Sequence, residues 1–347
     1  MAVRTRNLVV VGASAGGVEA LQRLMTGLPE RFPAAMAVVL HVSAQAGSAL
    51  SRILDRVGVL PVVPASDRLR ITPSVVVVAP PDRHLMVEGS TYRLSGGPRQ
   101  HGHRPAVDPL FKSAAIAAGA NVIGVVLSGS LDDGAAGAAA IARAGGLIVV
   151  QDPEEAPQPG MPRAAKSATG TDLVMPIGKI AEFLVSEVGR PVDLADRPNS
   201  EDLRHEVNFL LGSPLPSAGR GHAGKPTTLM CPECGGALFH APNQGVPHFR
   251  CWVGHSWSAE SLLDGQRSAL EAALWSAVRA LEERANLNAS MAQSARERGY
   301  AHAARRFEDS ATGTQESAQA LRKFVENVHA YDSADATVDE GAADQEA

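Results

Sequence analysis

The 347-residue sequence has few cysteines and no long hydrophobic run, and each absence excludes a class of protein. Its three cysteines are an odd number for a disulfide framework and suit a reducing compartment. The apolar run that follows Asn7 stops at Gly12, which is too short and too rich in glycine for a signal peptide. No later segment approaches a membrane span. We therefore expect a cytoplasmic protein without membrane insertion.

The sequence also lacks an excess of positive charge. Lysine and arginine number 32 against 37 aspartate and glutamate residues, which gives a formal net charge of −5. Six of the acidic residues fall in residues 332–347, where there is no lysine or arginine, so the rest of the chain is close to neutral. A nearly neutral protein has no positive electrostatic potential that would attract nucleic acid or anionic lipid. A nucleic-acid enzyme is therefore disfavoured.

From Leu8 to about Gly189, apolar β-branched runs alternate with helical stretches rich in alanine and leucine. Continuous apolar strands between helices indicate a parallel sheet that is covered on both faces. Residues 85–94 interrupt the alternation and predict a hairpin. The sequence thus predicts a doubly wound, mostly parallel α/β domain over residues 1–190. The expected strands are 8–11, 36–40, 75–79, 122–128 and 147–151, and the expected helices are 18–28, 48–57, 109–118, 135–144 and 177–187.

The remaining residues form four segments. Prolines break the periodicity over 191–227, which we expect to be a linker with a short helix at 201–211. Residues 228–257 hold all the cysteines, and Ser258 can cap a following helix. We expect a helical hairpin over 258–330, with its second helix around 300–329, and a disordered acidic tail over 331–347. The expected apolar face of the first helix contains Leu263, Leu270, Leu274, Ala277, Leu281 and Ala285.

The most informative motif is GASAGG at residues 12–17, between the first expected strand and the first expected helix. A phosphate-binding turn is one interpretation, but the dinucleotide fingerprint requires glycine where Ser14 stands, and no Lys-Ser/Thr pair follows for a P-loop. A nucleophile turn is the second, since it exposes the Ser14 hydroxyl at a sharp bend and places the N–H of Ala15 to hold an oxyanion. A turn that merely caps the helix is the third.

A base and an orienting acid would decide between these interpretations. The second expected strand ends at His41, and the strand at 122–128 leads into a turn that contains Asp132 and Asp133. Ligands bind outside the carboxyl ends of parallel strands, so we expect Ser14, His41 and one of the two aspartates to meet there. The order Ser–His–Asp differs from that of the α/β hydrolases, so that superfamily is not implied.

Short motifs in order through residues 7–189 are VVVGASAGG at 9–17, LHV at 40–42, APPDRH at 79–84, HRPAVD at 103–108, LSG at 127–129, DGAAG at 133–137 and GMPR at 160–163. In these motifs the chain resembles the catalytic domain of CheB-type chemotaxis receptor methylesterases, over about half its length. The resemblance implies a doubly wound α/β fold, with Ser14 as nucleophile, His41 as base and Asp133 rather than Asp132 as orienting acid. It also implies support of the oxyanion and its turn by Ala15, Gly16, Gly129, Ser130 and Met161.

The chain departs from that family in two places. Family members in chemotaxis typically carry a receiver domain ahead of the esterase, whereas the first expected strand here begins at Leu8. We therefore expect no regulation by phosphorylation of a receiver domain in the same chain. The family turn usually reads Gly-Met-Gly-x-Asp-Gly, and Ser130 stands at the position of its methionine, near the expected oxyanion. Asp133 is retained.

The cysteines form two short ligand pairs. Cys231 and Cys234 are separated by two residues, and His255 follows Cys251 after three more. Paired ligands at such spacings give tetrahedral N/S coordination of zinc, and a closed set of four leaves no open position for chemistry. The pattern predicts a zinc-ribbon-like module at 228–257 with structural zinc, and no cofactor for catalysis. His240 and His248 are alternatives to His255.

These observations predict a protein-glutamate methylesterase that releases methanol from glutamyl methyl esters, and the resemblance also permits glutamine deamidation. The expected partners are a methylated chemoreceptor or chemoreceptor-like signalling protein and a receptor methyltransferase, onto which the C-terminal half would dock the enzyme. The alternative is a catalytically weak scaffold that binds a signalling partner through its zinc and helical part. Because the triad and the zinc module are expected in separate cores, we expect esterase activity to be independent of the metal.

Overall fold

The computed structural model describes residues 5–45, 49–192, 201–213, 224–241 and 247–338. Met1–Leu263 form one compact unit, and Asp264–Ala347 form a second. No helix in the described ranges is long and apolar enough to cross a bilayer.

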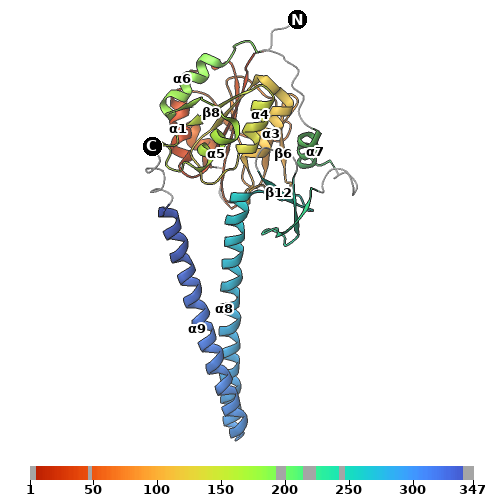
Figure 1. The fold of residues 1–347 in the computed structure, drawn as a ribbon. Helices are drawn as coiled ribbons and strands as arrows, with labels where there is room; N and C mark the ends of the chain where they lie inside the picture. Colours follow the sequence, from red (N-terminus) through yellow and green to blue (C-terminus); the bar gives the residue numbers. More distant parts are fainter. Residues whose placement is uncertain (1–4, 46–48, 193–200, 214–223, 242–246, 339–347) are drawn as a thin grey trace. The chain divides into compact units, whose positions relative to one another are not determined.

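A seven-stranded sheet forms the centre of the first unit (Figure 1). Its order, β3-β4-β2-β1-β7-β8-β9, places β1 between β2 and β7, and every neighbouring pair is parallel. The strands are rich in valine, and all except the edge strands β3 and β9 are almost wholly buried, as expected for a sheet that is covered on both faces. Their bounds are β1 Leu8–Ala13, β2 Ala35–Leu40, β3 Val62–Pro64, β4 Val76–Val78, β7 Val122–Val126, β8 Leu147–Gln151 and β9 Val174–Met175.

Helices cover both faces of this sheet. Because successive side chains of a strand point to opposite faces, Val9 and Val11 of β1 pack in one apolar core, while Leu8 and Val10 pack in the other. The first core is closed by α1 (Gly17–Thr26), α2 (Ala49–Asp55) and α6 (Ile177–Glu187), and the second by α3 (Val107–Ala118), α4 (Ala135–Arg143) and α5 (Gly160–Thr169). The prediction of a doubly wound α/β fold is confirmed.

The expected hairpin is present as the antiparallel pair β5 (His84–Glu88) and β6 (Thr91–Ser95). Four elements were missed by the sequence analysis. The edge strands β3 and β9 have only three and two residues, too few for a periodic signal. Helix α5 contains Pro162, but it lies in the first turn, where its missing N–H breaks no helical hydrogen bond. A 3-10 turn, η1 (Gly119–Asn121), leads into β7.

The first unit also contains a small antiparallel sheet of order β10-β11-β12-β13, here called the ribbon sheet. Its strands are β10 Pro226–Met230, β11 Ala237–His240, β12 His248–Cys251 and β13 Ser256–Ser258. Before it comes α7 (Glu201–Leu210), in the segment expected to be a linker. Because Val207 and Leu210 pack against Met86, this helix is part of the folded unit.

Two long helices account for the C-terminal part, α8 (Ala259–Glu297) and α9 (Ala301–Val338). An ion pair of 2.6 Å between Glu282 and Arg322 joins them, as the expected hairpin requires. The expected apolar face of α8 is right in part: Ala285 is buried and Leu274, Ala277 and Leu281 are half-buried, whereas Leu263 and Leu270 are exposed. Val278, Ala285 and Ala292 are buried at a seven-residue spacing, which is the period of a coiled-coil seam, and Leu263 and Leu270 lie off that register. The expectation of a disordered tail over 331–347 is wrong for residues 331–338, which continue α9, because extending a formed helix costs little per residue. Residues 339–347 lie outside the described residues.

Candidate active site and metal centre

Ser14 lies at a sharp turn between β1 and α1. Its N–H donates to the carbonyl of Ser128 (2.9 Å), and its own carbonyl accepts from the N–H of Gly17 (2.9 Å). Gly16 has φ +74°, and a Cβ there would lie 2.7 Å from Ser128 Oγ, so only glycine fits without a shift. The strand therefore ends in a tight strand–helix bend with a half-buried serine at its apex.

His41 lies directly after β2 and joins Ser14 to Asp133. Its Nε2 lies 2.7 Å from Asp133 Oδ2, and its Nδ1 lies 3.1 Å from Ser14 Oγ. A carboxylate only accepts hydrogen bonds, so Nε2 carries the ring proton of a neutral imidazole. Nδ1 is then left as the acceptor for the Ser14 hydroxyl. The three residues come from the carboxyl ends of β1, β2 and β7, three neighbouring strands of the sheet.

Asp133 is held in place by the first turn of α3. Its Oδ2 also accepts from the N–H of Val107 (2.7 Å), and its Oδ1 accepts from the N–H of Asp108 (3.0 Å). These are N–H groups without partners inside the helix, so Asp133 caps α3 as well as binding His41. Burial raises the pKa of Asp133, but the charge of His101 and the hydrogen bond from His41 outweigh it and hold the pKa below its usual value. The carboxyl is therefore ionised at neutral pH.

Asp132, the neighbouring candidate, points elsewhere. Its Oδ1 accepts from Ser258 Oγ (2.6 Å), beside the start of α8. Of the two aspartates that the spacing left open, the structure brings only Asp133 to His41.

Two histidines of the loop between β6 and α3 were given no role by the sequence analysis. The ring of His103 stacks on that of His41, with centroids 3.9 Å apart and planes 14° from parallel. Burial, and secondarily the charge of His41, lowers the pKa of His103 to about 4, so this ring is neutral at pH 7. His101 Nε2 lies 3.2 Å from Asp108 Oδ2 and 3.8 Å from Asp133 Oδ1. The only signal for this loop in the sequence was the motif at 103–108, which contributed to the family resemblance but gave neither histidine a role.

The residues expected to support an oxyanion lie around Ser14. The Gly129 position is crowded, since a Cβ there would lie 2.9 Å from Ser14 Cβ and 2.1 Å from Met161 Sδ. However, the N–H of Gly129 already donates to the carbonyl of Gln158 (2.9 Å), so its contribution is packing rather than an oxyanion hydrogen bond. The N–H of Met161 donates to Gly129 O (2.8 Å) and closes the same turn. Ser130 is exposed, with its hydroxyl 3.4 Å from Gln158 Oε1.

Comparison with known proteins shows the family of this chain. The sequence model described as CheB methylesterase matches residues 9–184. The chain belongs to the CheB methylesterase family. A Leptospira interrogans protein, provisionally named a protein-glutamate methylesterase/protein-glutamine glutaminase, is 38% identical over 178 residues, which are 51% of this chain and 92% of the relative. An Anaeromyxobacter dehalogenans protein of the same two named activities is 41% identical over 179 residues, 51% of this chain and 52% of its own length.

Among solved structures, the catalytic domain of the Thermotoga maritima CheB methylesterase is similar to this family member, with a TM-score of 0.52 and 32% identity. It covers 53% of this chain and is itself covered completely. The match to the CheB methylesterase family thus accounts for the parallel sheet and its helices. The family match ends at residue 184, before α7, the ribbon sheet and α8.

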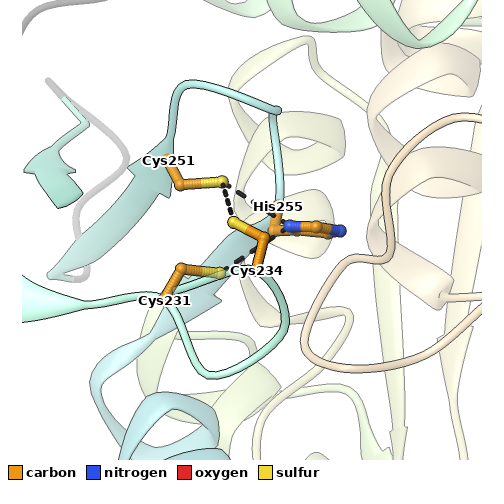
Figure 2. Close-up of side chains that lie close together, drawn as sticks. All are labelled: Cys231, Cys234, Cys251 and His255. Carbon is orange, nitrogen blue, oxygen red and sulfur yellow. Dashed lines mark hydrogen bonds between the residues drawn. The ribbon is translucent and has the colours of Figure 1, made fainter. Parts of the chain in front are cut away.

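Within that C-terminal part, the structure brings Cys231, Cys234, Cys251 and His255 together (Figure 2), with ligand atoms all within 4.8 Å of one another. Cys234 Sγ lies 3.7 Å from Cys251 Sγ, and His255 Nδ1 lies 3.6 Å from Cys251 Sγ. A zinc ion with Zn–S of about 2.3 Å and Zn–N of about 2.0 Å places tetrahedral ligands about 3.5–3.8 Å apart. The four side chains therefore fit zinc in both donor type and spacing.

The backbone around these ligands explains how four of them converge. Gly235 has φ +69°, and its N–H donates to Cys231 O (2.8 Å), which closes a tight turn around the first pair. Gly254 has φ +98° and donates in the same way to Cys251 O (3.0 Å). Of the alternative fourth ligands, His240 is not part of the group, and His248 points to Ser256, with Nε2 2.6 Å from its hydroxyl.

A second group, His101, Asp108 and His248, also has ligand atoms within 4.8 Å of one another. Lys112 Nζ, however, lies 3.0 Å from Asp108 Oδ2. A buried ammonium group already neutralises the carboxylate that a metal would need. We therefore assign this group to the charge network behind Asp133.

Proposed function

We propose that this chain is a serine hydrolase that demethylates glutamyl methyl esters of a chemoreceptor-like protein. The observation that carries the proposal is the unbroken hydrogen-bond chain from Ser14 Oγ through His41 to Asp133 at one edge of the sheet. A nucleophile, a base that can take its proton, and an acid that orients the base are the groups that acyl transfer through serine requires. The names of the homologues support this class of reaction.

The reaction proceeds in two halves. As Ser14 Oγ bonds to the ester carbonyl carbon, His41 Nδ1 takes the hydroxyl proton, and it then gives that proton to the leaving oxygen, so that methanol departs. Water next attacks the glutamyl–Ser14 ester, with His41 again as base, which frees the glutamate and restores the serine. Deamidation of glutamine follows the same course with ammonia as the leaving group.

Other groups of the site would stabilise the positive charge that develops on His41 and the negative charge of the oxyanion. Ionised Asp133 faces the imidazolium that His41 becomes and keeps its ring oriented. The N–H of Ala15, directly after the nucleophile in the turn that leads into α1, is proposed to hold the oxyanion, which is the position that a nucleophile turn uses for this purpose. On the side of Ser14 away from Ala15, the close packing of Gly129 against Ser14 and Met161 holds the turn at residue 129 in place.

We also propose that Cys231, Cys234, Cys251 and His255 hold a structural zinc ion. Four protein ligands complete the tetrahedron, so the ion would have no open position for substrate. Its contribution would be to the stability of the ribbon sheet, a segment too small to bury much apolar surface by itself. A methylated chemoreceptor or chemoreceptor-like protein is the proposed partner, with a receptor methyltransferase supplying the ester.

The test is methanol release from a methylated chemoreceptor by the full-length chain and its Ser14→Ala variant. We expect the variant to release none while folding normally, because the hydroxyl at this turn contributes little packing. Ser43→Ala, an exposed serine two residues after His41, is the matched control and should retain full activity. Activity in the Ser14→Ala variant would contradict the mechanism. A folded but inert wild-type chain would favour the scaffold alternative.

A further inference from the structure

The loop of residues Gln100–His103, here called the histidine loop, lies between the active site and the ribbon sheet. On its inner side, His103 stacks on His41, and His101 lies 3.8 Å from Asp133. Both members of the His41–Asp133 pair are therefore in contact with this loop. Residue His101 has φ +53°, a left-handed conformation that a non-glycine residue holds only when its surroundings fix it.

The surroundings that fix it belong to the C-terminal part of the chain. The N–H of His101 donates to Ser256 O (2.7 Å), and His101 Nδ1 lies 3.0 Å from Ser261 Oγ. Gln100 Nε2 donates to Gly254 O (3.1 Å), and the Trp257 ring packs over Gly102, 3.5 Å from where a Cβ would stand. Three of the four loop residues thus bond to or pack against one continuous segment, residues 254–261, and Gln100 Nε2 also donates to Pro98 O (3.0 Å) and Arg99 O (3.2 Å).

That segment is itself rigid for identifiable reasons. Ser258 Oγ accepts from the N–H of Ser261 and Ser261 Oγ accepts from the N–H of Ser258, each at 3.0 Å, a reciprocal cap at the start of α8. The residues Gly254 and Ser256 flank His255, which belongs to the proposed metal centre. The cap and the ligand pair therefore fix the two ends of the segment that holds the histidine loop.

A second connection runs through buried charges. Arg250 of β12 pairs with Glu206 of α7 (2.8 Å), Glu206 pairs with Lys112 of α3 (2.9 Å), and Lys112 reaches Asp108 (3.0 Å). The carboxylate of Asp108 is the one that lies against His101. Asp108, Lys112 and Glu206 are almost fully buried and Arg250 is half-buried, and removal of one partner from a buried pair leaves an uncompensated charge at high cost. The ribbon sheet is therefore joined to the histidine loop both directly and through α3.

We propose that the segment 254–261 is a positioning element for catalysis, which holds the histidine loop against His41 and Asp133 through Ser261 and Gln100. The proposal rests on the proposed function, since it concerns the geometry of the same triad. Neither side chain contacts Ser14, so their effect is on the orientation of the His41–Asp133 pair. Misplacement of a catalytic group by about 1 Å can cost a factor of about 10² in rate.

The experiment compares Ser261→Ala and Gln100→Ala with the wild type, all as full-length chains. The kinetics of methyl ester hydrolysis give kcat and KM, and a serine-directed fluorophosphonate gives both the rate and the final fraction of Ser14 labelling. We expect kcat and the labelling rate to fall roughly tenfold or more, with KM little changed and the labelled fraction complete. A variant that was merely less stable would instead lose labelled fraction at an unchanged rate. Ser276→Ala, an exposed serine of α8 bonded only to the helix carbonyl of Ala272, should match the wild type.

A lowered rate with a complete labelled fraction in either variant supports the proposal. Unchanged kcat and labelling rate in both variants would overturn it, provided that Ser14→Ala is inactive. If Ser14→Ala remained active or the fluorophosphonate labelled another residue, the proposed function itself would fail, and the two failures are thereby distinguished.

Discussion

Replacement of Asp133 by asparagine tests the orientation of His41 most directly. The side-chain amide has one oxygen and one NH₂ group, whereas the structure offers hydrogen-bond donors to both carboxylate oxygens. At Oδ2 the donors are His41 Nε2 and the N–H of Val107, and at Oδ1 the donor is the N–H of Asp108. Either orientation of the amide therefore leaves at least one donor without an acceptor.

The two orientations have different costs and different effects on the rate. With its NH₂ toward His41, the amide would lose two acceptor contacts and force the wrong tautomer, which costs about 10⁴-fold in the serine protease template. With its oxygen toward His41, the amide loses only the contact with Asp108, and the tautomer is kept. We expect the second orientation to prevail, so that only the charge is lost from the bond to His41. A hydrogen bond to a charged group is worth about 1.5–3 kcal/mol and a neutral one about 0.5–1.5 kcal/mol, and the difference of about 1–1.5 kcal/mol corresponds to roughly a 5- to 13-fold lower rate.

The assay is kcat/KM for methyl ester hydrolysis, together with the free energy of unfolding in urea. We expect Asp133→Asn to lose about 1–3 kcal/mol of stability, because the buried N–H of Asp108 is left unpaired. Asp132→Asn is the matched control, since its amide oxygen can still accept from Ser258 Oγ. A loss near 10⁴-fold would show that the amide turns the other way. Equal losses at both positions, or none at Asp133, would refute the assignment of the acid.

Further predictions concern the metal and the buried histidine. Elemental analysis of the purified chain should find one zinc per chain, and Cys234→Ser should lose it; a metal-free wild type would refute the site. Chelation of the zinc should unfold the ribbon sheet and lower kcat, whereas the sequence led us to expect activity independent of the metal. Unchanged kcat after complete zinc removal would show that the active site does not depend on the ribbon sheet. Burial lowers the pKa of His101, but Asp108 and Asp133 outweigh it and raise it from 6.5 to about 9. Protonation of His101 therefore adds up to about 3 kcal/mol to the free energy of unfolding. This contribution is complete below about pH 6.5 and is lost as the pH rises through about 9. Urea unfolding at both pH values should show this decrease in the wild type and not in His101→Asn.

The meeting of Ser14, His41 and Asp133 could be predicted because each follows a strand of the central sheet. A parallel sheet brings the carboxyl ends of neighbouring strands to one edge, so strand order carries the three side chains together without further information. The choice between Asp132 and Asp133 could not be made from spacing, since adjacent residues of a turn point in different directions. The resemblance to the methylesterases favoured Asp133, and the first turn of α3, whose N–H groups bind the Asp133 carboxylate, gives the physical reason.

The histidine loop could not be predicted for a different reason. His101 and His103 lie outside any helix or strand, where neither period 2 nor period 3.6 reports burial. Their contacts are with residues more than 150 positions later in the case of Ser261 and about 60 positions earlier in the case of His41. For α8 the expected face was right at Ala285 and wrong at Leu263 and Leu270, which are exposed. Val278, Ala285 and Ala292 form a buried seam at a seven-residue spacing, and the two alanines allow the helices to approach closely.

The boundary near residue 190 separates the family-matched sheet from α7 and the ribbon sheet, and composition alone gives no reason to place it elsewhere. Yet the hydrogen bonds of Ser258 to Asp132 and of Ser261 to His101 cross that boundary, and so does the buried pair of Lys112 and Glu206. If the chain ended at residue 190, each of these interactions would be lost and would leave a buried polar group without a partner. The free energy of unfolding would fall by about 1–3 kcal/mol for each neutral group and by more for a charged one. A fragment of residues 1–190 should therefore unfold at a lower temperature than the full chain and hydrolyse esters more slowly. Equal melting temperature and equal kcat in that fragment would show that the buried bonds contribute nothing to the catalytic unit.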